Sequence, residues 1–171
     1  VVTYQLAQRL KIDRLAACGR AWGFGEPTGI DLPTEIGGVV PDQDWARTTI
    51  SRTLYDGEVL QSALGQGYDL ATPLQVMNSF AALANGGTLY QPQLVRAVET
   101  SNGTVVQEFS PRVRRQIEIH PETLRMVHKA LEAGVSEEGG TSLTAYNSSG
   151  LRELGIDVAG KTGTAQVSHH M

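Results

Sequence analysis

The first helix expected from the sequence covers residues 1–17. Its large apolar side chains recur close to the spacing of one helical face, at Val2, Leu6, Leu10 and Leu15. This spacing predicts an amphipathic helix. We therefore expect the helix to pack this apolar stripe against the rest of its domain.

A second helix is predicted to begin after Thr72. Thr72 is a suitable N-cap, Pro73 suits the first helical position, and Gln75 completes a capping box. Asn85-Gly86-Gly87 should end this helix by supplying left-handed backbone. Apolar residues cover two adjacent faces, so we expect the helix to be mostly buried; they are Leu74, Met77, Ala81 and Ala84 on one face and Val76, Phe80 and Leu83 on the other.

A hairpin and a third helix are predicted further along the chain. Ser101-Asn102-Gly103 stands between two β-prone arms, which is a strong hairpin signal. The helix should run from about Pro121 to Ala133, because proline suits its start and Gly134 lies just past its end. Its apolar stripe consists of Leu124, Val127 and Leu131.

Three further segments have weaker signals. Residues 57–67 fit either a short helix or an extended run. Gln66 and Asp69, in the "GQGYD" turn at 65–69, could border a binding cleft, but a structural role for this turn is the preferred interpretation. The polar, glycine-rich residues 137–150 predict an irregular crossing. Small and branched residues alternate in 156–168, which favours a strand.

Glycine and proline dominate residues 19–41, "GRAWGFGEPTGIDLPTEIGGVVP". Such a composition excludes a regular helix and predicts a long structured loop with turns at Glu26-Pro27 and Gly37-Gly38. We expect Trp22 and Phe24 to anchor this loop to the core.

Composition places the chain among ordinary globular domains. It has 171 residues, of which 40% are hydrophobic and 19% charged, with a formal net charge of -4. The single cysteine, Cys18, excludes a disulfide framework, and we expect its side chain to be buried.

Arg112 and Arg114 could project from the same face of a strand. We interpret this face as solvated and not as a nucleic-acid-binding patch, because no aromatic residues accompany the arginines. No apolar run approaches the roughly 18 residues of a membrane span.

Lys161 belongs to two overlapping motifs. Residues 155–162, "GIDVAGKT", fit the phosphate-binding pattern G-x-x-x-x-G-K-[ST]. Residues 161–163 also spell K-T-G, a signature of penicillin-recognising serine enzymes. A phosphate loop needs a strand before it and a helix after it, and neither "SSGLREL" nor "GTAQVSHHM" suits these roles. A strand with small residues, along which an extended peptide could lie, fits these residues better.

Three segments together resemble a known family. "AGKTGTAQ" at 159–166 matches its third motif, "GFGEPTGIDLPTEIGGVVP" at 23–41 resembles the segment that follows its second motif, and "ALGQGYDLATPLQVMNSFAALANGG" at 63–87 resembles its long helical region. The family is the class B penicillin-binding proteins, which are peptidoglycan D,D-transpeptidases, and the elongation-type branch is the most similar. The order and spacing of the segments agree with this family over nearly the whole chain.

The resemblance implies an α+β fold: part of the penicillin-binding-protein and serine β-lactamase-like transpeptidase fold, with an antiparallel sheet flanked by helices. The family's first two motifs, S-x-x-K and S-x-N, do not occur in this chain. We therefore expect residues 1–171 to be a C-terminal fragment of a single transpeptidase domain, beginning after S-x-N and ending at the K-T-G strand. The strand edge at Asp157–Val167 should then be paired with the missing half, a partner chain or another copy.

The resemblance also implies roles for residues near the end of the chain. Lys161 would organise the site electrostatically and hydrogen-bond the serine of S-x-N. Thr162 would bind the carboxylate of the substrate or drug, and Gly163 would allow close approach. The N–H of Thr164 would serve the oxyanion hole, and Gln166 would contact the substrate. No cofactor and no metal is implied.

The activity implied for the parent protein is cross-linking of stem peptides through an acyl-serine intermediate, which β-lactams trap. Because the nucleophile and its lysine are absent, the chain alone should be inactive. The expected partners are stem peptides, β-lactams and a membrane glycosyltransferase, with no nucleic acid. The parent should lie at the outer face of the cytoplasmic membrane, in the periplasm, anchored by an N-terminal helix that this chain does not contain. A non-catalytic penicillin sensor or scaffold of the same family is the alternative, and a nucleotide-binding protein is a remote one.

Overall fold

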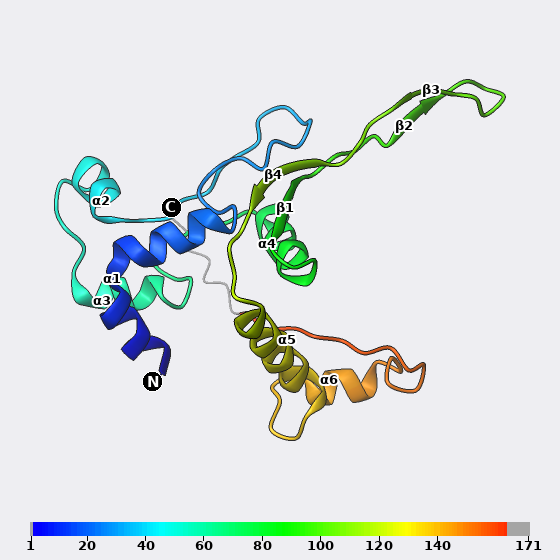
Figure 1. Ribbon diagram of the computed structural model, residues 1–171. Helices are drawn as coiled ribbons and strands as arrows, with labels where there is room; N and C mark the ends of the chain where they lie inside the picture. Colours follow the sequence, from blue (N-terminus) through cyan, green and yellow to red (C-terminus); the bar gives the residue numbers. More distant parts are fainter. Residues whose placement is uncertain (1, 164–171) are drawn as a thin grey trace, which may run out of the picture. The chain divides into compact units, whose positions relative to one another are not determined.

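The computed structural model describes residues 2–163, and the chain divides into two compact units, Val1–Ile117 and Glu118–Met171. The described residues form an α+β fold, as predicted. The elements, labelled in Figure 1, are α1 (Val2–Ala21), α2 (Gln43–Thr49), α3 (Asp56–Ser62), α4 (Pro73–Ala84), β1 (Thr88–Gln91), β2 (Ala97–Glu99), β3 (Val105–Glu108), β4 (Arg112–Gln116), α5 (Pro121–Ser136) and α6 (Leu143–Ser148).

Helix α1 is longer than predicted and is interrupted at Lys11, where the backbone leaves the helical region (φ 61°, ψ 166°). The buried side chains are Ala7, Ile12 and Ala16, whereas Leu6 is 51% and Leu10 38% exposed. The predicted apolar stripe is therefore wrong for Leu6 and Leu10, and Leu15 is half-buried.

Helix α4 begins as predicted, but it buries the opposite face. The hydroxyl of Thr72 accepts a hydrogen bond from the N–H of Gln75, and the Gln75 side chain accepts one from the N–H of Thr72, which completes the capping box. The expectation of a mostly buried apolar helix is wrong, since Met77 is 56% and Phe80 43% exposed. The buried side chains are instead Gln75, Asn78, Ser79 and Ala82.

The long loop at 19–41 is attached to the first unit by packing and by hydrogen bonds. Trp22 packs against a core of Ala82, Leu89 and Ile117, which confirms its predicted role as an anchor. The Gln75 amide donates to the carbonyl oxygens of Glu26, at 2.9 Å, and Gly37, at 2.7 Å.

Within the loop, the carboxylate of Glu35 accepts backbone and side-chain hydrogen bonds that stabilise an irregular turn. Glu35 accepts hydrogen bonds from the N–H and hydroxyl of Thr28 and from the N–H of Gly29, at 2.7, 2.5 and 2.8 Å. Burial alone would raise the pKa of Glu35, but these hydrogen bonds outweigh it and lower the pKa. The ionised carboxylate thus closes the turn.

Two arginines of β4 bind this loop. Arg114 and Arg115 both form ion pairs with Glu26, and Arg114 donates to the carbonyl of Pro27 at 2.7 Å. The interpretation of the cluster as a simply solvated face is therefore incomplete. These guanidinium groups join the strand to the loop, which gives them a structural role.

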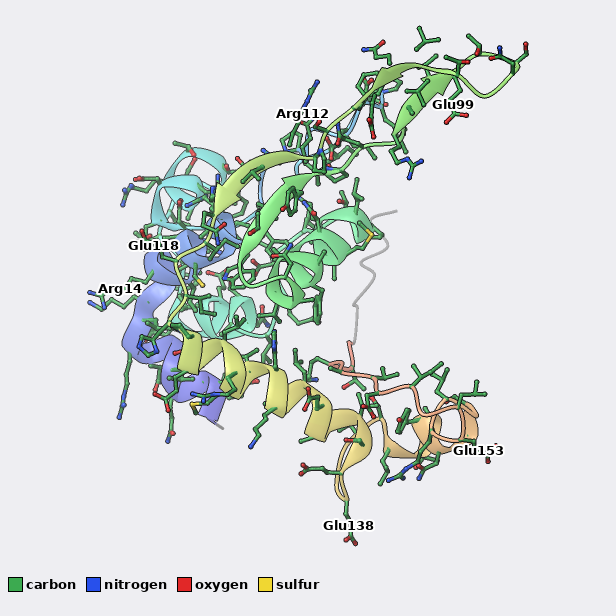
Figure 2. The ribbon with its side chains drawn as sticks, turned by 45° about the vertical axis from the view of Figure 1, so that its right-hand side comes forward. Arg14, Glu99, Arg112, Glu118, Glu138 and Glu153 are labelled. Carbon is green, nitrogen blue, oxygen red and sulfur yellow. The ribbon has the colours of Figure 1, made fainter. Side chains whose placement is uncertain are left out.

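Two antiparallel strand pairs occur among the described residues, β1 with β4 and β2 with β3. The predicted hairpin turn is confirmed between β2 and β3, where the N–H of Gly103 donates to the carbonyl of Thr100. In Figure 2, Glu99 marks this hairpin. Helix α4 packs beside β1.

The second unit contains α5 and α6. Helix α5 begins at Pro121 as predicted and continues to Ser136, with the imidazole of His120 accepting from the N–H of Glu122. Helix α6 lies where an irregular crossing was predicted, so that prediction is wrong for Leu143–Ser148. Figure 2 shows Glu138 projecting from the turn between the two helices.

Cys18 is exposed, so the prediction of a buried cysteine is wrong. No helix among residues 2–163 is long and apolar enough to cross a membrane.

Candidate functional site

The segment 156–163, which leads to the K-T-G residues, forms no strand in the structure. The predicted strand at 156–168 is therefore wrong for its described part. The expected pairing of the edge at Asp157–Val167 with the missing half, a partner chain or another copy stays a prediction. The segment is instead attached to helices: the N–H of Gly160 donates to the carbonyl of Leu131 at 3.1 Å, and the hydroxyl of Tyr146 donates to the carbonyl of Ile156 at 2.9 Å. Backbone groups that a sheet would have paired are thus used by α5 and α6.

Lys161 and Thr162 form the polar centre of the segment. The ammonium of Lys161 donates to the carbonyl oxygen of Thr162 at 2.9 Å and to its hydroxyl at 3.1 Å. The Thr162 hydroxyl also lies 3.5 Å from the hydroxyl of Thr141. All three residues are exposed. A cation and two hydroxyls therefore meet at the surface, where they can bind an anionic group such as a carboxylate.

The turn after α5 brings Thr141 to this position. The N–H of Gly140 donates to Glu137, and the N–H of Ser142 donates to Gly134. A Cβ at Gly140 would lie 2.7, 2.8 and 2.9 Å from the carbonyl oxygens of Ala133, Gly134 and Glu137. Only glycine therefore fits this turn. Thr141 was not predicted as a site residue, although the Gly139-Gly140 pair after a predicted helix is the signal that could have located the turn.

An open cavity of about 320 Å³ adjoins the segment. Its apolar wall includes Val135, Tyr146, Leu151 and Val158, and Lys161 and Thr162 also line it. Tyr146 was not predicted either, because nothing in the local pattern shows that its hydroxyl meets a carbonyl ten residues later.

The remaining predicted site residues are only partly described. Gly163 is exposed, and a Cβ there would meet no atom within 4 Å, so the space beside it is open. Thr164 and Gln166 lie outside the described residues, and their roles remain predictions.

The geometry contradicts the phosphate-loop interpretation of residues 155–162. Helix α6 ends at Ser148, and residues 151–155 are turns, so no strand leads into Gly155. Lys161 and Thr162 do not begin a helix in the described residues. The strand that leads into such a loop is therefore missing, and the residues after Gly163, where its helix would lie, are outside the described residues.

The first unit contains a separate cavity of about 380 Å³. Ser62 and Asp69 contribute to its lining, and the hydroxyl of Ser62 donates to the Asp69 carboxylate at 2.5 Å. Burial raises the pKa of Asp69, and this hydrogen bond offsets only part of the rise. The contact ties the last residue of α3 to the turn that follows, in agreement with a structural role for Asp69.

Comparison with known proteins gives a consistent result over nearly the whole chain. A family model described as the penicillin binding protein transpeptidase domain matches residues 1–170. The chain is 33% identical to the peptidoglycan D,D-transpeptidase MrdA of Haemophilus influenzae over 171 residues, which cover 96% of this chain and 24% of that protein. It is 30% identical to MrdA of Escherichia coli, covering 96% of this chain and 25% of that protein. The chain thus spans about a quarter of the length of these curated relatives.

Solved structures show the same similarity. PBP2 of Pseudomonas aeruginosa in complex with WCK 5153 aligns with a TM-score of 0.72 at 32% identity, over 86% of this chain and 33% of that chain. PBP2 of Helicobacter pylori in complex with MreC aligns with a TM-score of 0.67 at 28% identity, over 86% of this chain and 25% of that chain.

Proposed function

The chain belongs to the penicillin-binding protein transpeptidase domain family, within the elongation-type branch of class B, and we propose that it is part of an enzyme that cross-links peptidoglycan. In this proposal, residues 1–171 are the C-terminal part of the transpeptidase domain and follow its S-x-N motif. The serine nucleophile and its lysine then belong to the portion that precedes Val1.

The observation that carries the proposal is the cluster of Lys161, Thr162 and Thr141. The Lys161 ammonium and the Thr162 hydroxyl lie 3.1 Å apart, and both are exposed. A substrate carboxylate placed here accepts a hydrogen bond from the Thr162 hydroxyl and is attracted by the ammonium. The open space beside Gly163 lets a peptide backbone approach. The cluster therefore suits the terminal carboxylate of a D-Ala-D-Ala stem peptide or the carboxylate of a β-lactam.

The proposed reaction proceeds in two acyl transfers. The upstream serine attacks the penultimate D-Ala carbonyl, an acyl-enzyme forms and the terminal D-Ala leaves. The amine of a second stem peptide then attacks the acyl-enzyme and forms the cross-link. Lys161 hydrogen-bonds the serine of S-x-N, the N–H of Thr164 stabilises the oxyanion, and Gln166 contacts the substrate. The chain alone has no nucleophile for the first step and is inactive.

The proposed setting is the outer face of the cytoplasmic membrane, in the periplasm. There the parent protein acts beside a membrane glycosyltransferase that supplies glycan strands. The solved complex of Helicobacter pylori PBP2 with MreC supports a place within an assembly.

Labelling of the full-length protein with fluorescent penicillin tests the role of Lys161. We expect Lys161→Ala to slow covalent labelling by at least about tenfold, since a preorganised charged group is lost. Lys129→Ala removes an exposed lysine of α5 and is the matched control. Equal labelling rates for the two variants contradict the proposal.

A non-catalytic penicillin sensor or scaffold of the same family is the alternative. Both it and the enzyme would be acylated by penicillin, so labelling does not separate them. Turnover of a stem-peptide substrate does: release of D-Ala with formation of a cross-linked dimer supports the enzyme, and acylation without turnover supports the sensor.

A further inference from the structure

Arg112 differs from the other two arginines of β4. Arg114 and Arg115 form ion pairs with Glu26, whereas Arg112, the first residue of the strand, is exposed and lines a cavity of about 340 Å³. Figure 2 labels Arg112 where the β1–β4 pair meets the hairpin of β2 and β3. The cavity therefore offers a guanidinium group to a ligand.

Hydrogen bonds hold the walls of this cavity in place. On one side, the Gln91 amide donates to the carbonyl oxygen of Gly29 at 2.5 Å, and the N–H of Gly29 donates to Glu35 at 2.8 Å. On the other side, the N–H of Phe109 donates to the carbonyl oxygen of Arg96 at 2.9 Å. Walls that are already ordered lower the cost of binding, because little conformational freedom is lost when a ligand enters.

The lining combines two opposite charges with apolar side chains. Arg112 and Asp31 both line the cavity and are exposed, and they are not paired with each other. The apolar side chains of the lining include Ile30, Leu94, Val95 and Phe109. Leu94 is 59% and Val95 49% exposed, so a ligand that covers them removes apolar surface from water.

This combination selects among the possible classes of ligand. Ligand pockets in proteins have volumes of about 300–1,000 Å³, so a cavity of about 340 Å³ suits a small molecule. A phosphate ion would be repelled by Asp31, and a metal cation would be repelled by Arg112. A short peptide with free ends has a carboxylate for the guanidinium, an ammonium group for the aspartate and a side chain for the apolar wall.

We propose that this cavity binds a short free peptide. The peptide carboxylate pairs with Arg112, its ammonium group pairs with Asp31, and an apolar side chain lies against Leu94 and Val95. The proposed site belongs to the first unit and uses none of the residues assigned to the transpeptidase reaction. It does not depend on the proposed function.

The test uses the full-length protein and the dipeptide leucyl-leucine as the probe. Ligand-observed NMR titration measures the dissociation constant, before and after treatment of the protein with penicillin, which blocks the transpeptidase site. We expect a dissociation constant of about 1 mM or tighter in both states. The C-terminal amide of the dipeptide should bind about tenfold more weakly, because its pairing with the guanidinium is lost.

Arg112→Gln is the discriminating variant. It should bind the free dipeptide about tenfold more weakly than the wild type does, and it should no longer prefer the free acid to the amide, because the carboxylate has lost its partner. Arg96→Gln is the matched control, since Arg96 is an exposed arginine just before β2 and does not line the cavity. Both substitutions are at exposed positions, and an unchanged thermal midpoint verifies that both variants are folded.

Each contrary outcome is specific. Equal dissociation constants for Arg112→Gln and Arg96→Gln overturn the proposal, as does a wild-type protein that does not bind the dipeptide. Binding that disappears after penicillin treatment places the probe in the transpeptidase site and also overturns it. If penicillin does not acylate the wild type, the proposed function fails, while the comparison of the two arginine variants still supports or contradicts the peptide site.

Discussion

The side-chain amide nitrogen of Gln75 lies 2.7 Å from the carbonyl oxygen of Gly37, a residue 38 positions earlier in the chain. The same nitrogen donates to the carbonyl of Glu26, and the same side chain's oxygen caps α4 through the N–H of Thr72. One buried polar side chain therefore joins the start of a helix to two points of the glycine-rich loop.

Removing this side chain should be costly. Gln75→Ala leaves two loop carbonyls and the Thr72 N–H without their partner, in a place where Gln75 is 1% exposed. We expect the free energy of unfolding of the domain to fall by about 3 kcal/mol. Chemical denaturation of the full-length protein measures it, with Gln93→Ala at an exposed position as the control. A loss no larger than that of the control would show that the three contacts do not stabilise the loop.

A methyl group at Gly38 should be equally disruptive. A Cβ there would lie 2.2 Å from the carbonyl oxygen of Leu70, and the backbone has φ +67°. Gly38→Ala must therefore break the backbone bridge between Val39 and Leu70, and we expect a loss of about 2–4 kcal/mol in the free energy of unfolding.

Gly57→Ala is the matched control for this prediction. A Cβ at Gly57 meets nothing within 4 Å, and the residue lies in α3. Alanine is the better helix former, so this variant should gain about 0.5–1 kcal/mol. Equal effects of the two alanines in the same denaturation assay would refute the close approach at Gly38.

The pH dependence of stability should reflect Glu58. The hydrogen bond from Arg52, and that from the N–H of Tyr55, lower the pKa of Glu58 from 4.5 to about 2. A carboxylate with a lowered pKa stabilises the fold fully above its unfolded pKa, and that contribution is lost as pH falls from about 4.5 toward 2.

Glu58→Gln should therefore lower the thermal midpoint near neutral pH and reduce the fall of that midpoint as the pH is lowered toward 2. Thermal unfolding between pH 7 and pH 2 checks this. Glu122→Gln, at an exposed carboxylate of α5, is the control and should leave the acid limb close to that of the wild type. A wild-type slope in Glu58→Gln would contradict the assignment.

The contact between Thr141 and Thr162 predicts a binding effect without a folding effect. Thr141→Val keeps the shape of the side chain and removes the hydroxyl that lies 3.5 Å from that of Thr162. We expect acylation by a carboxylate-bearing β-lactam to slow several-fold, with little change in thermal midpoint. Thr144→Val, at an exposed position on α6, is the control and should react like the wild type.

Local signals in the sequence predicted the starts of α4 and α5 and the hairpin turn correctly, whereas α2 and α6 were not predicted. The Thr72–Gln75 capping box and the Ser101–Gly103 turn depend on residues a few positions apart, so both can be predicted without knowing the rest of the fold. The burial of whole faces was predicted less well. Periodicity identifies the apolar face of α4, but it does not show what covers that face, and the structure buries Gln75 because its long-range hydrogen bonds satisfy it.

The residues of the candidate site likewise fall into those that a local motif predicts and those that only the fold brings together. The K-T-G motif located Lys161 and Thr162, because the motif is contiguous. Thr141 and Tyr146 come from the turn and helix before it, and their contacts with the segment follow from the fold of the second unit. The strand predicted from alternating residues does not form in 156–163, where the Gly160 N–H and the Ile156 carbonyl are hydrogen-bonded to α5 and α6.

The central claim is that this chain provides one wall of a transpeptidase site whose nucleophile lies upstream. Intact-mass and peptide mapping after penicillin treatment, on the full-length protein and on residues 1–171 alone, test it most directly. We predict a single penicilloyl adduct on a serine that precedes Val1 in the full-length protein, and none on the chain alone. An adduct within residues 1–171, or no adduct on the full-length protein, would contradict the account.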